Sequence, residues 1–210
     1  MICYVLINGE LHPTEHMQQV LKTHPTDLVV VADGGIQHVK TLGVRPDVWL
    51  GDFDSAPPET LLDHPDLQRI PYPTNKDLLD SEIALEYALE KGAKTIIVWG
   101  ALGGRTDHTL AVMLLATRYP HIDLMLHSGT ESVHPLHPHH PLVLHTVPEQ
   151  TLSVLAVLPL HHLNIRGVRW ELFDAHVERG SGWTMSNVAV QHQVKVWCTA
   201  GLGLVVVQHT

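Results

Sequence analysis

Short apolar segments alternate with amphipathic segments along the first 126 residues. Each apolar segment has the length of a buried strand, and each amphipathic segment repeats its apolar residues near the helical period. The predicted strands are Cys3–Ile7, Leu28–Ala32, Val48–Leu50, Thr95–Trp99 and Ile122–Leu126, with Leu67–Ile70 as a further candidate. The predicted helices are Thr14–Lys22, Gly35–Leu42, Asp77–Lys91 and Thr106–Tyr119. Because strands that alternate with helices form right-handed βαβ units, this half predicts an α/β domain with a mainly parallel, Rossmann-like sheet.

The pattern changes near residue 129. The segment from Ser128 to Pro141 holds three prolines and four histidines, and it predicts an exposed loop. Beyond it, β-branched and partly alternating segments predict an all-β C-terminal sandwich or small barrel. These segments are Leu142–Val147, Thr151–Leu158, Leu163–Phe173, Val188–Trp197 and Leu202–Gln208. The expected division is therefore an α/β domain over residues 1–128, a His/Pro-rich linker over 129–141 and a β-sandwich domain over 142–210.

The chain is acidic, and its charge is unequally divided. The net charge is −9, and residues 1–126 hold 17 of the 22 acidic residues but 9 of the 13 basic ones. A protein held on nucleic acid mainly by phosphate contacts needs a basic excess, so no nucleic-acid partner is expected. The acidic balance suits metal ions or cationic small molecules better.

A cytoplasmic location is expected, with no membrane association. The N-terminal sequence MICYVLINGE lacks the basic and long apolar regions of a signal peptide, and the longest apolar run, Leu110–Ala116, is too short to cross a bilayer. Cys3 and Cys198 lie at opposite ends of the chain without a CxxC pair, which predicts buried, reduced thiols.

Candidate chemistry follows the predicted strands. Asp52 and Asp54 come directly after Val48–Leu50, and residues two apart on an extended chain point to the same side. Two converging carboxylates form a hard-oxygen site suited to Mg²⁺, although a surface turn rich in Asp and Ser explains them equally well. Asp33 and Gly34 follow Leu28–Ala32, where they are able to contact the polar edge of a nucleotide or simply form a strand-to-helix turn.

Two further motifs lie at helix starts. Asp77 and Asp80 share one face of a predicted helix whose first residues include Lys76, an arrangement that fits either a metal-phosphate site or ordinary helix-dipole compensation. The glycines of GALGGRTDH, with Arg105 and the free N–H groups of the following helix, predict a phosphate cradle. Because the carboxyl ends of parallel strands share one edge, the four motifs together predict a Mg²⁺–phosphate site.

The order of these motifs resembles that of the thiamine pyrophosphokinase family. The chain carries ADGG, then PDVWLGDFDS, then KDxxDxE, then GGRTDH, and later GVRWEL and TMSN. The resemblance extends from about Asn8 over most of the chain. It implies an N-terminal α/β domain, a C-terminal β-sandwich, a homodimer, and transfer of pyrophosphate from the co-substrate ATP to the hydroxyl of thiamine.

The resemblance also implies roles for individual residues. Asp52, Asp54 and Asp80 match the positions that hold Mg²⁺, and Arg105 joins them as a catalytic residue. The nucleotide- and phosphate-binding positions are Asp33, Gly34, Lys76, Asp77, Arg105 and Asp107. Thr184, Ser186 and Asn187 match the segment that lines the thiamine pocket at the dimer interface. On this view residues 1–128 are catalytic, and residues 142–210 bind the substrate and dimerise.

Two positions depart from the family pattern. Leu79 stands where a threonine is usual, and Val112 stands where an asparagine is usual. Each change removes a hydrogen-bonding group near the phosphates and leaves the metal carboxylates in place. Nucleotide preference and rate are the properties that these positions put in question.

Two other functions are compatible with the sequence. The chain is also interpretable as an ATP pyrophosphokinase for another alcohol, such as a pterin, or as a non-catalytic nucleotide- or metal-binding protein that uses its histidines. Five of the 18 histidines, from His134 to His145, crowd the Pro-rich segment. We expect this segment to be a solvated linker, because proline limits how far its side chains converge on an ion.

Overall fold

The computed structural model describes residues 1–53, 65–72 and 78–209. The chain forms two compact units. The first unit comprises Met1–Leu115 and His121–Thr130, and the second comprises Ala116–Pro120 and Glu131–Thr210. Each unit has its own hydrophobic core.

A parallel sheet organises the first unit. Its strands lie in the order β4-β3-β2-β1-β5-β6, and all five strand pairings are parallel. Their bounds are β1 Ile2–Leu6, β2 Leu28–Ala32, β3 Val48–Gly51, β4 Gln68–Pro71, β5 Thr95–Trp99 and β6 Asp123–His127. The chain moves outward from β1 through β2, β3 and β4, and then returns to the other side of β1 with β5. The predicted parallel sheet is confirmed strand by strand.

The helices of this unit follow the predicted order, although their bounds differ from the predicted ones. They are α1 Glu15–Thr23, the 3₁₀ helix η1 Asp33–His38, α2 Val39–Leu42, α4 Asp80–Glu90 and α5 Thr106–Ala116. The hydroxyl of Thr14 caps α1 by accepting a hydrogen bond from the N–H of Met17 at 3.1 Å. The end of α5 at Ala116 precedes the predicted end at Tyr119, since Pro120 disfavours helix at the residue before it. Among the described residues, no helix combines the length and apolar character needed to cross a membrane.

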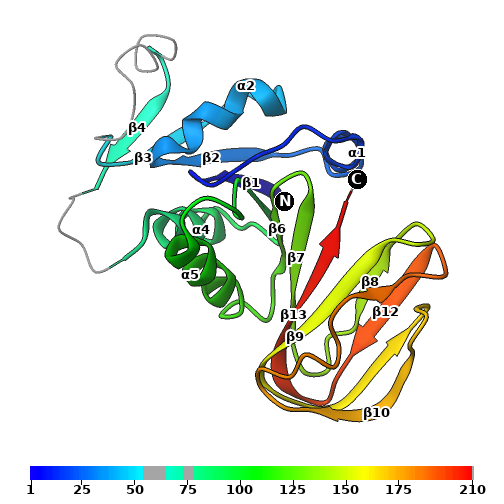
Figure 1. Ribbon diagram of the computed structural model, residues 1–210. Helices are drawn as coiled ribbons and strands as arrows, with labels where there is room; N and C mark the ends of the chain where they lie inside the picture. The colour runs from blue at the N-terminus through cyan, green and yellow to red at the C-terminus, as the bar shows by residue number, and fades with distance from the viewer. Residues whose placement is uncertain (54–64, 73–77, 210) are drawn as a thin grey trace. The chain divides into compact units, whose positions relative to one another are not determined.

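Helices cover both faces of this sheet. Side chains of α1, η1 and α2 pack on the face formed by Tyr4, Val31 and Trp49, and α4 contacts β1, β2 and β3. Figure 1 shows α2 and α4 on opposite sides of the sheet. Because both faces of the sheet are covered, β2 is apolar along its whole length (LVVVA), as is typical of a buried parallel strand.

Antiparallel strands form the second unit. They are β7 Glu131–Leu136, β8 Leu142–His145, β9 Thr151–Arg166, β10 Leu172–Val177, β11 Asn187–Val188, β12 Gln193–Trp197 and β13 Ala200–Gln208. The central strand β9 has 16 residues. Its first half pairs with β13 and β11, and its second half pairs with β10 and β12. Because β9 belongs to both sets of strands, a single core of residues such as Val154, Ile165 and Val205 serves them all.

The predicted loop after Ser128 is wrong for residues 131–136. Strand β7 occupies Glu131–Leu136 and pairs in register with β13, and the Val133 and Leu136 side chains are completely buried. Burial of these two apolar residues outweighs the polar and proline-rich composition. Pro135 is compatible with this strand because, within its unit, β7 pairs with β13 alone. Residues 128–130 and the tight turn from His137 to His140 keep the expected loop character.

Candidate functional site

A cavity of about 300 Å³ opens at the carboxyl ends of β1, β2 and β5. Strand order reverses beside β1, and such a reversal is where open parallel sheets bind ligands. Its walls combine backbone segments with a few polar side chains. The lining residues are Ile7, Asn8, Gly9, Ala32, Asp33, Asp80, Ser81, Gly100, Ala101, Gly103, Arg105, His108, Thr109 and Val112.

The turn after β2 brings Asp33 to this cavity. Asp33 has a positive φ of 42°, a conformation that is uncommon for a residue with a side chain and is often found at functional sites. Its carbonyl oxygen accepts a hydrogen bond from the Trp49 indole N–H at 2.9 Å, which fixes the turn. The next residues must be small: a Cβ on Gly34 would lie 2.6 Å from Asn8 Cγ, and one on Gly35 would lie 2.2 Å from the Leu6 carbonyl oxygen.

The end of β3 lies against the same turn. A Cβ on Gly51 would lie 3.2 Å from Asp33 Cα, so the backbone before Asp52 passes close to Asp33. Phe53 has a φ of 61°, and its ring packs edge-on against Trp49 with the centroids 5.1 Å apart. Asp52, which stands between Gly51 and Phe53 in the sequence, is half-buried. Its predicted partner Asp54 lies outside the described residues.

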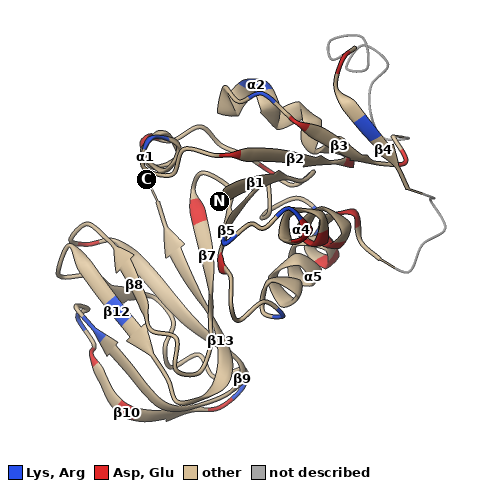
Figure 2. Ribbon diagram, turned by 180° about the vertical axis from the view of Figure 1, so that it is seen from behind, with Lys and Arg blue, Asp and Glu red and all other residues tan. Residues whose placement is uncertain are grey.

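The start of α4 contributes Asp80 and Ser81. Leu79 occupies the N-cap position and makes no side-chain cap, so the substitution of the usual threonine removes a hydroxyl that is suited to this role. Asp80 begins the helix, where a negative charge complements the helix dipole. Figure 2 shows red acidic residues along α4. Lys76 and Asp77, which are predicted to bind the nucleotide phosphates, precede this segment and lie outside the described residues.

Ser81 is an unusual residue for a cavity wall. It is 2 % exposed, and within the described part of the chain nothing forms a hydrogen bond with its hydroxyl. Val112 of α5, which stands where the family pattern has an asparagine, is also buried at the cavity. The wall is therefore less rich in accessible hydrogen-bonding groups than the family pattern predicts.

The glycine segment after β5 closes the cavity. Gly103 and Gly104 have φ values of 77° and 69°, and the Gly104 N–H donates to the Glu10 carboxylate at 3.1 Å. The Thr109 hydroxyl donates to the Gly103 carbonyl at 2.9 Å. Both contacts fix the segment immediately before α5.

Arg105 and Asp107 pair with each other. Arg105 Nε lies 3.2 Å from Asp107 Oδ1, and Arg105 Nη2 lies 2.6 Å from Asp107 Oδ2. The hydrogen bond from Arg105, aided by the backbone N–H of His108, lowers the pKa of Asp107 to about 2. Both side chains are exposed, so Arg105 is able to exchange this carboxylate for a phosphate group at little cost.

A second pocket, of about 380 Å³, lies in the second unit. It is lined by Trp170, Leu172, Trp183, Thr184, Met185, Ser186 and Asn187. The two indoles are 58 % and 61 % exposed, so large aromatic surfaces face the pocket without a covering layer. Such surfaces suit a flat aromatic ligand.

The three residues predicted to bind thiamine play different parts in this pocket. The Thr184 hydroxyl donates to the Val154 carbonyl, and the Asn187 side chain accepts from the Trp170 N–H at 3.2 Å and donates to the Trp170 carbonyl at 2.8 Å. Both side chains are therefore committed to holding the pocket wall. Ser186 is exposed with a φ of 55°, and its N–H donates to Ser153 Oγ at 2.9 Å. Its hydroxyl is the best placed of the three to meet a ligand.

Sequence reasoning missed the residues after β1. Asn8 and Gly9 line the cavity, and Glu10 holds the glycine segment. They follow a predicted strand as the other motifs do, so their position was an available signal. The pattern INGE carries no recognised chemistry, which is why it stood apart from the other motifs.

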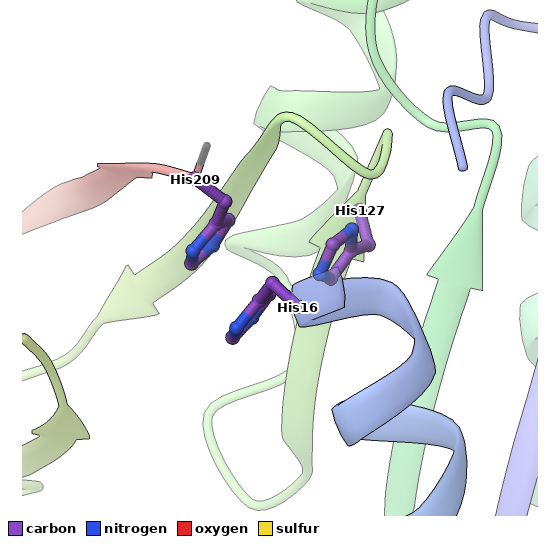
Figure 3. Close-up of side chains that lie close together, drawn as sticks. All are labelled: His16, His127 and His209. Carbon is purple, nitrogen blue, oxygen red and sulfur yellow. The ribbon is translucent and has the colours of Figure 1, made fainter. Parts of the chain in front are cut away.

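The buried His127 at the end of β6 packs against His16 of α1, which is half-buried. The His127 ring packs on that of His16, with the centroids 5.3 Å apart and the planes 17° apart (Figure 3). His127 Nδ1 accepts a hydrogen bond from the Gly129 N–H at 2.8 Å, which shapes the turn after the strand. Burial lowers the pKa of His16, so this ring is held neutral. Neither ring lines the cavity.

Comparison with known sequences identifies two regions of the chain. Residues 18–126 match the family described as "Thiamin pyrophosphokinase, catalytic domain", and residues 139–202 match "Thiamin pyrophosphokinase, vitamin B1 binding domain". A curated thiamine pyrophosphokinase from Bacillus subtilis (strain 168) is 25 % identical over 172 residues, which cover 76 % of this chain and 77 % of the relative.

Solved structures share the fold. Thiamine pyrophosphokinase from Bacillus subtilis matches with a TM-score of 0.86 at 21 % identity, and all of both chains is covered. Thiamin pyrophosphokinase from Geobacillus thermodenitrificans gives 0.84 at 26 % identity, covering 100 % of this chain and 98 % of that one. The enzyme from Candida albicans gives 0.78 at 17 % identity, covering 99 % and 89 %.

Ser81→Ala should stabilise the ligand-free protein. The substitution removes a buried hydroxyl for which the described residues offer no hydrogen-bond partner, and alanine favours helix, so we expect the free energy of unfolding to rise by about 1 kcal/mol. Urea denaturation measures this change. Ser153→Ala is the matched control, because its hydroxyl accepts from the Ser186 N–H and its loss should lower stability by about 1 kcal/mol. A loss of stability in Ser81→Ala would show that the hydroxyl is satisfied.

The Arg105–Asp107 pair should be visible in a pH titration. Because the pKa of Asp107 is lowered, the pair stabilises the folded state above the ordinary value of 3.8 and loses this effect as the pH falls through about 2. NMR titration of the Asp107 carboxyl should give a midpoint near pH 2, and Arg105→Gln should raise it toward 3.8. The exposed Arg45 is the control: Arg45→Gln should leave the midpoint unchanged. An equal midpoint in wild type and Arg105→Gln would contradict the pairing.

Proposed function

Since the chain belongs to the thiamin pyrophosphokinase family and is a thiamine pyrophosphokinase, we propose that ATP binds in the 300 Å³ cavity of the first unit and that its pyrophosphate is transferred there. The observation that carries this proposal is the meeting of Asp33, Asp80 and Arg105 at one cavity beside the strand-order reversal. Carboxylates and a guanidinium at one opening suit a metal-bound polyphosphate.

The residues at the cavity fit a magnesium ion. Asp80 lines the cavity, Asp52 lies beside the Asp33 turn, and carboxylate oxygens are the ligands that Mg²⁺ prefers. We propose that Asp52 and Asp80 hold the ion together with Asp54. When bound, Mg²⁺ neutralises charge on the phosphate oxygens. Asp33, Gly34, Lys76, Asp77 and Asp107 complete the proposed nucleotide site.

In the proposed reaction the hydroxyl oxygen of thiamine attacks the β-phosphorus of ATP. A bond forms between these two atoms, the bond from the β-phosphorus to the α–β bridging oxygen breaks, and AMP leaves. The hydroxyl proton passes to a cavity carboxylate. Arg105 leaves Asp107 to hold phosphate oxygens, and Lys76 assists it, so that alignment and charge neutralisation carry the catalysis.

We propose that thiamine binds in the pocket of the second unit. Trp170 and Trp183 offer stacking surfaces, Ser186 offers a hydroxyl, and Thr184 and Asn187 position them. Thiamine is a cation, and indole faces attract cations. The antiparallel strands around the shared strand β9 support a β-sandwich, just as the parallel sheet of the first unit supports a Rossmann-like domain. The proposed division of labour is catalysis by residues 1–128, and substrate binding and dimerisation by residues 142–210.

A homodimer is the proposed assembly. Met185 and both indoles of the pocket lining expose apolar surface, and a second copy of the chain would cover it. We also propose a cytoplasmic location, because Cys3 and Cys198 are buried free thiols. The match to a vitamin B1 binding domain favours thiamine over another alcohol, and the match to a catalytic domain favours catalysis over a purely binding role.

Release of AMP from ATP and thiamine tests this function directly. Asp54→Asn and Asp80→Asn should each lower kcat by about 10³-fold or more, because each removes a carboxylate from the transition-state environment, while the circular dichroism spectrum stays unchanged. Asp123 is an exposed carboxylate at the start of β6, so Asp123→Asn should keep wild-type turnover. Wild-type turnover in Asp54→Asn or Asp80→Asn would overturn the metal assignment.

The second pocket is tested by Trp183→Ala. Loss of the exposed indole should raise KM for thiamine by about 10-fold through lost stacking, and leave KM for ATP nearly unchanged. Steady-state kinetics with each substrate varied in turn separates the two effects. Phe173 is equally exposed but lies outside the pocket lining, so Phe173→Ala should preserve both constants. A rise confined to KM for ATP would refute thiamine binding at this pocket.

A further inference from the structure

Two histidines come together on the outer face of β9 and β10. Leu160 pairs with Val177 and Leu163 pairs with Ala175, so two residues of β9, His161 and His162, lie opposite the single residue His176 of β10. This is a β-bulge, and its extra residue His162 has a φ of 53°. The four flanking residues are buried in the core, which leaves the histidines exposed.

The imidazole rings of His161 and His176 approach each other through their Nδ1 atoms. Their Nδ1 atoms are 3.2 Å apart, whereas the ring centroids are 4.5 Å apart with planes tilted by 48°. Because the nitrogens lie closer than the ring centres, the two rings open away from each other behind their Nδ1 atoms. The two Nδ1 atoms thus lie within hydrogen-bonding distance of each other on the exposed side of the strands.

We propose that His161 and His176 bind a divalent transition-metal ion, with Zn²⁺ as the probe, through their Nδ1 atoms. Zn–N bonds are about 2.0–2.1 Å long, and two such bonds at a tetrahedral angle place the nitrogens about 3.3 Å apart. The Nδ1 atoms have nearly this separation without any movement of the backbone. His162 is not a ligand, because its Nδ1 contacts the Asp174 carboxylate. Water molecules therefore complete the coordination of the ion.

Glu178 supports this geometry. Its Oε1 lies 2.8 Å from His176 Nε2, so the Nε2 proton is directed to the carboxylate and the Nδ1 lone pair is free for a metal. Metal-bound histidines commonly carry such a carboxylate on their other nitrogen. In the metal-free protein His161 Nδ1 is then the donor to His176, and on binding its proton moves to the exposed Nε2 or to solvent.

The chemistry of this site differs from that of the cavity in the first unit. Two imidazole nitrogens select Zn²⁺, Cu²⁺ or Ni²⁺, whereas Mg²⁺ and Ca²⁺ prefer oxygen ligands. The site therefore binds a class of ion that pyrophosphate transfer does not require. It lies within the second unit alone, and its binding is measurable whatever the outcome of the AMP assay.

The test uses full-length protein stripped with EDTA and titrated with ZnSO₄ or MgSO₄. Histidine side-chain NMR should show His161 and His176 shifting with Zn²⁺ but not with Mg²⁺. Crystals soaked in Zn²⁺ should show an anomalous peak about 2 Å from both Nδ1 atoms. Glu178→Gln should weaken Zn²⁺ binding at this site by about 10-fold or more, because it removes the supporting carboxylate.

His161→Gln and His176→Gln should each abolish the peak and remove one equivalent of bound Zn²⁺. The exposed His192 is the control, so His192→Gln should bind as many equivalents as wild type. An unchanged number of equivalents in His161→Gln and His176→Gln, or a wild-type crystal without a peak at the two Nδ1 atoms, would overturn the proposal and leave the pair as a hydrogen bond only.

Discussion

The cavity of the first unit depends on backbone segments that approach one another too closely for any side chain. A Cβ on Gly35 would lie 2.2 Å from the Leu6 carbonyl oxygen, and one on Gly9 would lie 2.3 Å from the Gly100 oxygen. The Gly9 N–H donates to that same oxygen at 2.8 Å. These contacts draw the ends of β1, β2 and β5 together. Polar groups carried on three separate segments consequently face one volume of a size that suits a nucleotide phosphate chain.

The parts of the fold that the sequence predicts are those where local pattern and tertiary environment agree. Strands such as LVVVA are apolar along their whole length because both faces of the sheet are covered. Residues 131–136 were predicted as a loop, because local composition gives no measure of how deeply Val133 and Leu136 are buried. The sequence likewise predicts where the turns at Asp33 and Phe53 occur but not their backbone conformation. Their positive φ values accompany contacts with Trp49, which local sequence does not reveal.

The candidate sites show the same division. Strand ends identify Asp33, Asp52 and the glycine segment, because the parallel topology brings every such end to one edge, and Asp80 is identified by its place at a helix start. The sequence does not reveal that Arg105 pairs with Asp107, or that the Thr184 and Asn187 side chains turn inward. These details depend on which partner a polar side chain finds after folding. The bulge that joins His161 to His176 is a further case, since it comes from an unequal count of residues between two paired strands.

Asn187 has a consequence for the pocket of the second unit beyond its own hydrogen bonds. Its side-chain amide pairs with both the N–H and the carbonyl of Trp170, as a neighbouring strand would. The exposed indole at residue 170 is thereby attached to a backbone that is already ordered before any ligand arrives. Much of the conformational entropy that such an aromatic residue ordinarily loses on ligand binding is therefore lost during folding instead. The pocket is pre-organised, and a small ligand needs correspondingly few contacts to be retained there.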